Sequence, residues 1–173
     1  MTISMYQASV PRLINGLTNL SHILGKAQAH AEAKKIDPVV FATMRLYPDM
    51  FPLSRQVQIA CDVSKGLVAR LAGVDIPAHE DTEKDLKDLQ ARIAKTIDFL
   101  STVTAESLAG TEDKVVSFPA GPDRVLKLKG RDFLYQWVLP NLYFHTVTAY
   151  NILRHNGVDV GKMDYLKGAD FLP

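Results

Sequence analysis

Features that would assign this 173-residue sequence to a particular class of protein are scarce or absent. Its one cysteine, Cys61, cannot form a disulfide within the chain, which favours a reducing compartment. No run approaches the roughly 18 consecutive apolar residues of a membrane-spanning helix. Residues 1–6 have neither the basic segment nor the apolar run of a signal peptide. We therefore predict a cytoplasmic protein that does not associate with membranes.

Motifs for nucleotides, zinc and nucleic acid are also lacking. The chain has no P-loop and no dinucleotide-binding glycine pattern, and a single cysteine excludes paired-cysteine zinc motifs. The 20 Lys and Arg residues nearly balance the 19 Asp and Glu residues, for a net charge of +1. Such a balance argues against strong electrostatic binding to nucleic acid. These absences leave an ordinary globular protein.

What the sequence does contain is helical periodicity. Apolar residues recur at steps of three and four in four segments, which predict helices over residues 9–34, 50–72, 83–102 and 131–156. A shorter helix is expected to begin at Pro38. The length fits a single domain over residues 1–173. We predict a mainly all-α fold, a four-helix bundle.

Capping residues set the expected helix ends. Ser9 is predicted to cap the first helix, with Pro11 in its first turn. Asp49 is predicted to cap the second helix, and Gly73 to end it. On the third helix, Asp88 and Arg92 are spaced as an ion pair on the solvent side.

The segments around the fourth helix are less regular. Two β-rich runs, 114–118 and 124–128, flank the turn residues 119–123 and predict one small β-hairpin between helices three and four. Pro140 lies inside the fourth helix, where a kink is expected. The tail, 158–173, has no helical period, and we expect it to lie on the bundle or across a dimer contact. Its apolar residues are Met163, Tyr165, Leu166, Phe171 and Leu172.

The fourth helix carries the best indication of a site, because its apolar stripe turns polar half-way along. The stripe is Leu134, Val138, Asn141, His145, Thr148, Ile152 and His155. Buried polar groups need partners, and bundle cores with inward polar groups are where helical proteins build ligand and metal sites. His145 is thus either a ligand-binding residue or a core histidine that a neighbour satisfies.

The second helix offers partners for His145. It carries Gln56, Gln58 and Asp62, of which Gln58 and Asp62 are four residues apart beside the Cys61 stripe. These two side chains either face His145 and complete a polar pocket with Asn141, or lie at the edge of the helix interface. Cys61 itself is expected to be a packed thiol.

Two segments have a distinctive sequence. They are PDMFPLSRQVQIACD, at residues 48–62, and NLYFHTVTAYNILRHNG, at residues 141–157. Together they resemble an uncharacterised bacterial family of unknown function that is grouped with the DinB/YfiT-like helical bundles. The resemblance covers residues 5 to about 166. It implies a DinB-like fold and brings no established activity.

The wider superfamily implies a metal site. In typical members one histidine on the second helix and a His-x-x-x-His pair on the fourth hold zinc or nickel, with an open position for substrate. Relatives include thiol-dependent transferases and isomerases. His145 matches the first histidine of the pair, but Ala149 stands four residues later, and residues 50–72 contain no histidine. Gln58, Asp62 or His22 would have to replace the missing ligands.

Three functions stay open on the sequence alone. The first is a DinB-like bundle with a degenerate metal site and no inherited metal chemistry, which binds no cofactor or an unknown small molecule. The second is a metal- or thiol-dependent enzyme with an altered site around His145, and with zinc or nickel as its cofactor. The third is a homodimeric interaction or stress-response module, in which the tail and the hairpin are covered by a second copy.

Overall fold

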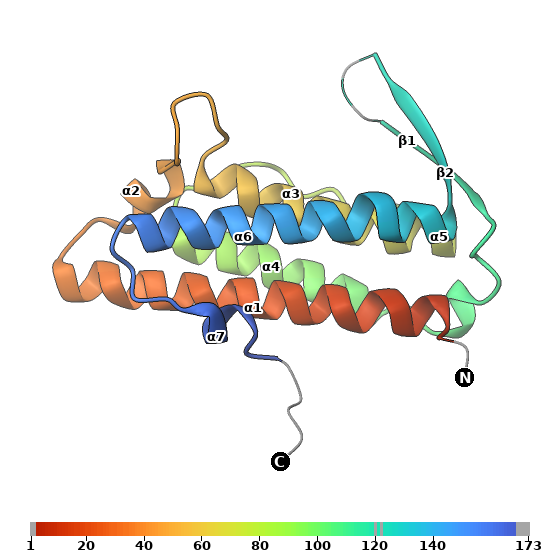
Figure 1. The fold of residues 1–173 in the computed structure, drawn as a ribbon, viewed down its shortest axis with the longest axis horizontal. Helices are drawn as coiled ribbons and strands as arrows, with labels where there is room; N and C mark the ends of the chain where they lie inside the picture. The colour runs from red at the N-terminus through yellow and green to blue at the C-terminus, as the bar shows by residue number, and fades with distance from the viewer. Residues whose placement is uncertain (1–2, 120, 122, 169–173) are drawn as a thin grey trace.

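The computed structural model describes residues 3–119, 121 and 123–168 (Figure 1). It confirms the predicted mainly helical bundle with one β-hairpin. The four long helices are α1 (Met5–Lys34), α3 (Leu53–Ala72), α4 (Leu86–Ser101) and α6 (Leu139–His155). Helix α3 packs against α4 and α6, and α1 packs against the same two helices. Helices α1 and α3 therefore lie on one diagonal of the bundle, and α4 and α6 on the other.

The first helix begins a turn earlier than its sequence suggested. Ser4 caps α1 by accepting a hydrogen bond from the Gln7 backbone N–H, and the Gln7 side chain accepts in return from the Ser4 N–H. This reciprocal cap satisfies two N–H groups that would otherwise lack partners. Ser9 is buried inside the helix, where its hydroxyl donates to the Met5 carbonyl. The prediction of Ser9 as the cap was wrong, and Pro11 lies within the helix.

The next two long helices begin later than predicted. Helix α3 starts at Leu53 with Pro52 in the capping position, not with Asp49, and ends at Gly73 in the left-handed conformation as expected. Helix α4 starts at Leu86, because the Asp85 side chain accepts from the backbone N–H of residue 88. Between α1 and α3, the short α2 (Pro38–Thr43) confirms the expected start at Pro38.

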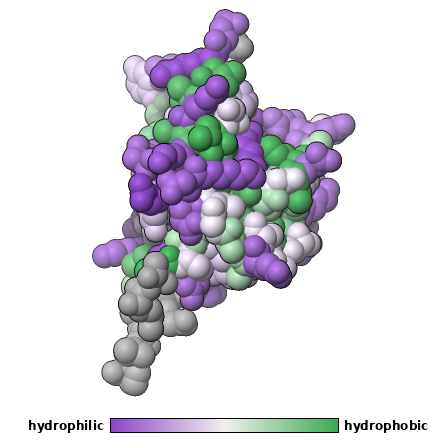
Figure 2. Space-filling view, turned by 90° about the vertical axis from the view of Figure 1, so that its right-hand side faces the viewer, coloured by the Kyte–Doolittle hydropathy of each residue, from purple (hydrophilic) through white to green (hydrophobic). Residues whose placement is uncertain are grey.

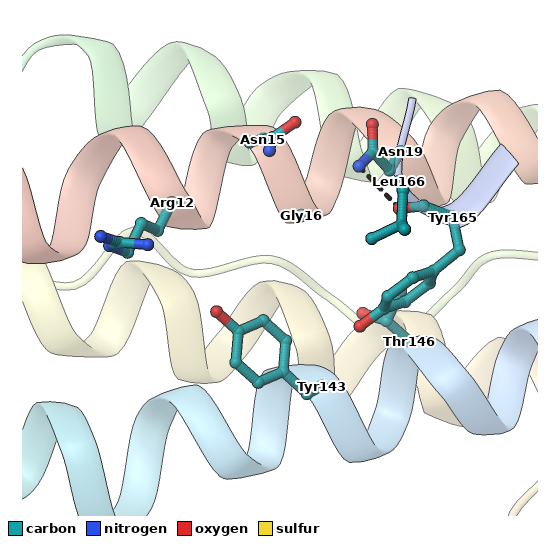
Figure 3. Close-up of a pocket in the computed structure, with 8 residues that line it drawn as sticks. All are labelled: Arg12, Asn15, Gly16, Asn19, Tyr143, Thr146, Tyr165 and Leu166. Atoms are coloured by element: carbon teal, nitrogen blue, oxygen red, sulfur yellow. Dashed lines mark hydrogen bonds between the residues drawn. The ribbon is translucent and has the colours of Figure 1, made fainter. Parts of the chain in front are cut away.

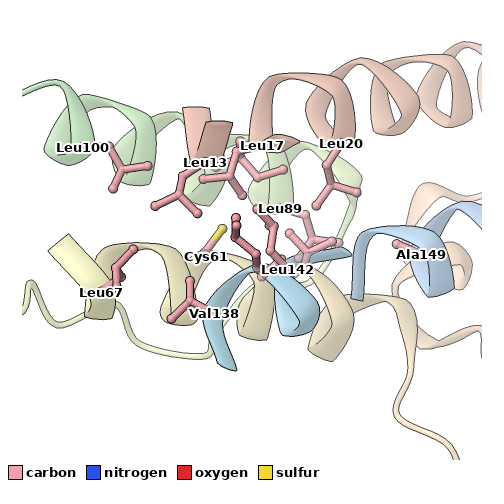
Figure 4. Close-up of a cluster of buried hydrophobic side chains, with 14 of the residues drawn as sticks. Leu13, Leu17, Leu20, Cys61, Leu67, Leu89, Leu100, Val138, Leu142 and Ala149 are labelled. Carbon is pink, nitrogen blue, oxygen red and sulfur yellow. The ribbon is translucent and has the colours of Figure 1, made fainter. Parts of the chain in front are cut away.

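A core of leucines from all four long helices surrounds Cys61 (Figure 4). On α1, the contributing leucines Leu13, Leu17, Leu20 and Leu24 are fully buried. Each fully buried side chain of this kind stabilises the fold by about 1.5–3 kcal/mol. The inward position of Cys61 agrees with the predicted packed thiol.

The hairpin packs on its own chain. Strand β1 (Val115–Pro119) pairs antiparallel with β2 (Val125–Lys129), as the sequence predicted, after the short η1 (Glu106–Leu108). On its inner face the Phe118 ring lies 4.5 Å from the ring of Phe133 and 5.0 Å from that of Trp137. On the outer face Val115 and Val125 are exposed. Figure 2 shows this end of the molecule, with apolar areas beside hydrophilic ones. The predicted turn residues Ala120 and Pro122 lie outside the described residues.

The disturbance expected at Pro140 takes the form of a wider helical turn. The chain passes from α5 (Gly130–Asp132) through the π-helical η2 (Phe133–Val138) into α6. The Leu139 N–H reaches back five residues to the Leu134 carbonyl. Since the proline ring has no N–H and crowds the carbonyl four residues earlier, a π-helical turn accommodates it.

The tail contains a short helix that the sequence did not predict, α7 (Lys162–Tyr165), and it packs on α1. Met163 is exposed, whereas Tyr165 packs against the core. Phe171 and Leu172, which we also expected to cover the bundle, lie outside the described residues. Within residues 3–119, 121 and 123–168, none of the helices has both the length and the apolarity needed to cross a bilayer.

Candidate functional site

The polar stripe of α6 meets α3 at a hydrogen-bonded pair, His145 and Gln56. Nδ1 of His145 lies 2.7 Å from Oε1 of Gln56, and both side chains are buried. Nε2 of Gln56 donates to the carbonyl oxygen of Phe51 at 2.9 Å, which fixes the orientation of the amide. The Gln56 oxygen must then accept from His145, so Nδ1 carries the hydrogen and Nε2 keeps a lone pair.

His145 is a neutral base in this position. Burial lowers its pKa from 6.5 to about 4, and the positive charge of Arg55 acts in the same direction. The imidazole therefore stays uncharged near neutral pH. The pair presents one uncharged nitrogen acceptor on α6, beside the ring of Phe144, whose centroid lies 5.2 Å from that of His145.

We expect the stability contribution of His145 to be complete above pH 6.5 and to be lost as the pH falls towards about 4. In this interval the histidine of the unfolded chain binds a proton that the folded chain excludes, and stability rises with pH wherever the unfolded state binds more protons. In His145→Gln the free energy of unfolding should vary less over this interval, as measured by urea unfolding at a series of pH values. The exposed His155→Gln is the control. An equal pH dependence in His145→Gln and the unaltered protein would contradict the burial of a neutral imidazole.

Asn141 does not reach this pair by any hydrogen bond that the structure describes. Its side-chain nitrogen donates to the carbonyl oxygen of Trp137, in the preceding turn, at 2.7 Å. The residue lies on the same stripe as His145, as the spacing predicted, but its polar group serves the backbone near Pro140.

Gln58 and Asp62 form their hydrogen bonds in a separate charged network. Gln58 donates to Glu83 at 2.8 Å, and Asp62 accepts from Arg92 at 3.0 Å. Arg92 also pairs with Glu83 at 2.7 Å and with Asp81 at 3.0 Å. The network joins α3 to α4 and to the segment between them. The structure thus brings together His145 and Gln56, and groups Gln58 and Asp62 elsewhere.

A cavity of about 290 Å³ lies between α1, α6 and α7 (Figure 3). Its lining residues are Arg12, Asn15, Gly16, Asn19, Tyr143, Thr146, Tyr165 and Leu166. Thr146 is 2% exposed, and its hydroxyl has no hydrogen-bond partner among the described residues. A buried hydroxyl without a partner is rare in proteins. The cavity therefore has an unused polar group in its wall.

The carboxylate of Asp164 holds α7 over this cavity. Its Oδ1 lies 3.0 Å from Nε2 of His22, and its Oδ2 lies 3.0 Å from Nζ of Lys26, both on α1. A hydrogen bond from the Gly161 N–H, together with these partners, holds the pKa of Asp164 far below its usual range. Asn19 adds a 2.8 Å hydrogen bond to the Tyr165 carbonyl. These contacts fix the wall that α7 contributes.

The sequence predicted that Tyr165 and Leu166 belong to a tail packed on the bundle or across a dimer contact, but it did not predict the cavity or its α1 and α6 residues. One signal was present, since Arg12, Asn15 and Asn19 are polar at steps of three and four and so share a face of α1 beside its apolar stripe. Thr146 gave no signal, because a threonine next to a polar stripe looks the same whether or not its hydroxyl has a partner.

Comparisons with known proteins place this fold in a family. Residues 5–166 match the family model described as Domain of unknown function (DUF1993). The chain belongs to the DUF1993 family. It is also similar to the crystal structure of a DinB family member protein from Shewanella denitrificans, with 42% sequence identity and a TM-score of 0.89. That similarity covers 98% of this chain and 95% of the other. No curated protein matches.

These matches confirm the predicted resemblance and its DinB-like four-helix fold. The DUF1993 protein is DinB-like, and neither match names an activity.

The residues of this DUF1993 protein do not fit the metal site of the wider superfamily. A zinc ion usually takes at least three protein ligands, and only Nε2 of His145 is available at the matching position. Its partner on α3 is an amide, and Ala149 has no donor. In the part of the chain that the structure describes, no three His, Cys, Asp or Glu side chains lie close enough to hold a metal ion.

The thiol of the DUF1993 protein is not suited to act as a nucleophile. Cys61 is fully buried, and burial raises its pKa to about 12. The thiolate is the nucleophilic form of cysteine. Cys61 is therefore an inert core residue near neutral pH.

Proposed function

We propose that this DUF1993 protein binds a small molecule in the cavity between α1, α6 and α7, without metal chemistry. The Thr146 hydroxyl carries the proposal, because it is buried at the cavity and has no partner among residues 3–119, 121 and 123–168. Leaving such a group unsatisfied costs about 1–3 kcal/mol. Once a small movement of the cavity wall exposes this oxygen, a polar group of a ligand would supply the missing hydrogen bond.

The shape of the cavity supports the same function. Ligand pockets are mostly apolar hollows of roughly 300–1,000 Å³ with a few converging polar groups. At about 290 Å³ this one matches the lower end of that range. The ring of Tyr143, from α6, and the ring of Tyr165, from α7, both line the cavity, and Leu166 lies near Tyr165 (Figure 3). A compact organic molecule fits this space better than a dinucleotide.

Replacing Thr146 by valine tests the proposal. The substitution keeps the shape and removes the unsatisfied hydroxyl, so we expect the ligand-free protein to be as stable as before or about 1 kcal/mol more stable. Binding of small molecules should weaken. Urea unfolding measures the first effect, and ligand-observed NMR with a panel of small organic molecules measures the second.

Thr148→Val is the matched control on the same helix. Its hydroxyl donates to the Phe144 carbonyl at 2.7 Å, so valine should lower the free energy of unfolding by about 0.5–1 kcal/mol and leave binding unchanged. Equal effects of the two substitutions on stability and on binding would contradict the proposed role of the cavity.

We also propose that the protein is a cytoplasmic homodimer, with its contact at the exposed rings near His145. Phe144 is 60% exposed and Phe51 is 56% exposed, and both adjoin the His145–Gln56 pair. Exposed aromatic side chains grouped in this way are typical of protein contacts. Sedimentation at micromolar concentration should give a dimer, and Phe144→Ser should give a monomer. If the unaltered protein sediments as a monomer, the proposed dimer is wrong.

A further inference from the structure

We infer that the ligand of the α1–α6–α7 cavity is a small organic carboxylate with a flat apolar body. This inference rests on the proposed binding function of the cavity and adds the chemical class of the ligand. It follows from the charge of the lining, from its hydrogen-bond donors and from its aromatic walls.

The charge of the lining has one sign. Arg12 is the one charged residue among the described residues of the wall, and no Asp or Glu lines the cavity there. Within residues 3–119, 121 and 123–168, Arg12 has no ion pair. The nearby His22 and Lys26 differ in this respect, because Asp164 binds both. The cavity therefore favours a negatively charged group beside Arg12.

The other polar groups of the wall include several donors. The hydroxyl of Tyr143 points across the gap toward α1, and the ring of Tyr165 extends from α7 toward α6 (Figure 3). Burial and the nearby Tyr143 raise the pKa of Tyr165, so its hydroxyl keeps its proton. Phenol and threonine hydroxyls donate to oxygen acceptors. With the guanidinium of Arg12, they suit a ligand rich in acceptors.

The order of the lining residues along the cavity indicates the shape of the rest of the ligand. Arg12 lies at one end and Tyr165 with Thr146 at the other, with Tyr143 between them (Figure 3). Gly16 lies in the α1 wall between these ends, where a Cβ atom would lie 3.2 Å from Cδ2 of Leu142, so α1 and α6 approach each other closely there. A flat apolar body can lie against the tyrosine rings while the carboxylate meets the fork of N–H donors of Arg12. A second polar atom of the ligand would then lie at the Thr146 end of the cavity.

Matched pairs of probes test this class. Benzoate, 4-hydroxybenzoate and phenylacetate are titrated into the full-length protein, each against its primary amide, with binding followed by calorimetry and by NMR signals of Thr146. The acids should bind at least tenfold more tightly than the amides. Arg12→Gln should abolish this difference, and Lys127→Gln on the exposed hairpin should preserve it. Because Arg12 is an exposed side chain, its substitution should leave the fold intact, which circular dichroism checks.

The other outcomes distinguish the two claims, that the ligand is a carboxylate and that the cavity binds a small molecule. Equal binding of acids and amides with shifted Thr146 signals would overturn the carboxylate and keep the binding function. Preference for acids that persists in Arg12→Gln would overturn the role of Arg12. Failure of every acid to bind at millimolar concentration would overturn the inference. If neutral molecules of the wider panel also failed to shift Thr146, the proposed function would fall with it.

Discussion

Replacing Arg92 by methionine should lower the free energy of unfolding by about 3 kcal/mol. The arginine side chain is 2% exposed, and it is the shared partner of Asp62, Asp81 and Glu83. Removing one member of a buried ion pair leaves the others without compensation, which typically costs about 3–5 kcal/mol. The lower end applies here because Asp62 and Asp81 are partly exposed and water can hydrate them.

Replacing Arg92 would leave the carboxylate of Glu83 without its charged partner. Burial acts to raise its pKa, but hydrogen bonds from Arg92 and Gln58 outweigh burial and lower it. Without Arg92, the carboxylate would stay buried with the amide of Gln58 as its remaining side-chain partner. The segment that carries Glu83 connects α3 to α4, so its attachment to both helices should weaken as well.

Arg55→Met is the matched control for Arg92. Arg55 also pairs with Asp81, at 2.7 Å, but both side chains are more than one-third exposed. Exposed pairs contribute about 0–1 kcal/mol, so this substitution should change stability little. Urea unfolding followed by circular dichroism compares the two variants. Similar losses in both would show that the Arg92 network is no stronger than a surface ion pair.

The second large effect is expected for Gly130→Ala, which should lower the free energy of unfolding by about 3 kcal/mol. A Cβ atom at this position would lie 2.1 Å from the carbonyl oxygen of Thr111 and 2.9 Å from Cδ2 of Leu71. The backbone there cannot move freely, because the Gly130 N–H donates to the Lys114 carbonyl at 2.8 Å. The substitution would separate the end of the hairpin from the bundle.

Gly25→Ala is the control for Gly130. Gly25 lies inside α1, and a Cβ there would meet no atom closer than Nε2 of Gln90 at 3.5 Å, an ordinary contact. Alanine is more favourable than glycine in a helix by about 0.8–1 kcal/mol, so this variant should be more stable than the unaltered protein. Thermal and urea unfolding measure both variants. A loss of stability in Gly25→Ala as large as that in Gly130→Ala would contradict the steric argument.

The helices and the hairpin were largely predictable because their signals are local. Spacing of apolar residues predicted the four long helices, and the β-rich runs at 114–118 and 124–128 predicted both strands. Helix ends were predicted less well. Ser9 and Asp49 both have the chemistry of a cap, yet Ser4 and Pro52 occupy those positions, because the chain before each helix determines which residue takes the capping conformation.

The partners of Arg92 and His145 could not be predicted from the spacing of residues within one helix. Spacing alone paired Arg92 with Asp88 on the solvent side of α4, and this prediction was wrong. Asp88 instead accepts from the Lys84 N–H, while Arg92 is buried. A side chain as long as that of arginine binds whatever carboxylates the neighbouring segments bring, and spacing on one helix does not describe those segments.

By itself, the sequence determined the helical bundle, the hairpin and the inward position of His145, because periodicity and residue type are properties of each segment, and the resemblance of residues 48–62 and 141–157 indicated the family. The tertiary structure decided which groups meet. Successive residues of a helix differ by about 100° in direction, so the rotation of α3 against α6 gives His145 the partner Gln56 and not Gln58. The cavity beside Thr146 exists only where α1, near the start of the chain, meets α6 and α7, near its end.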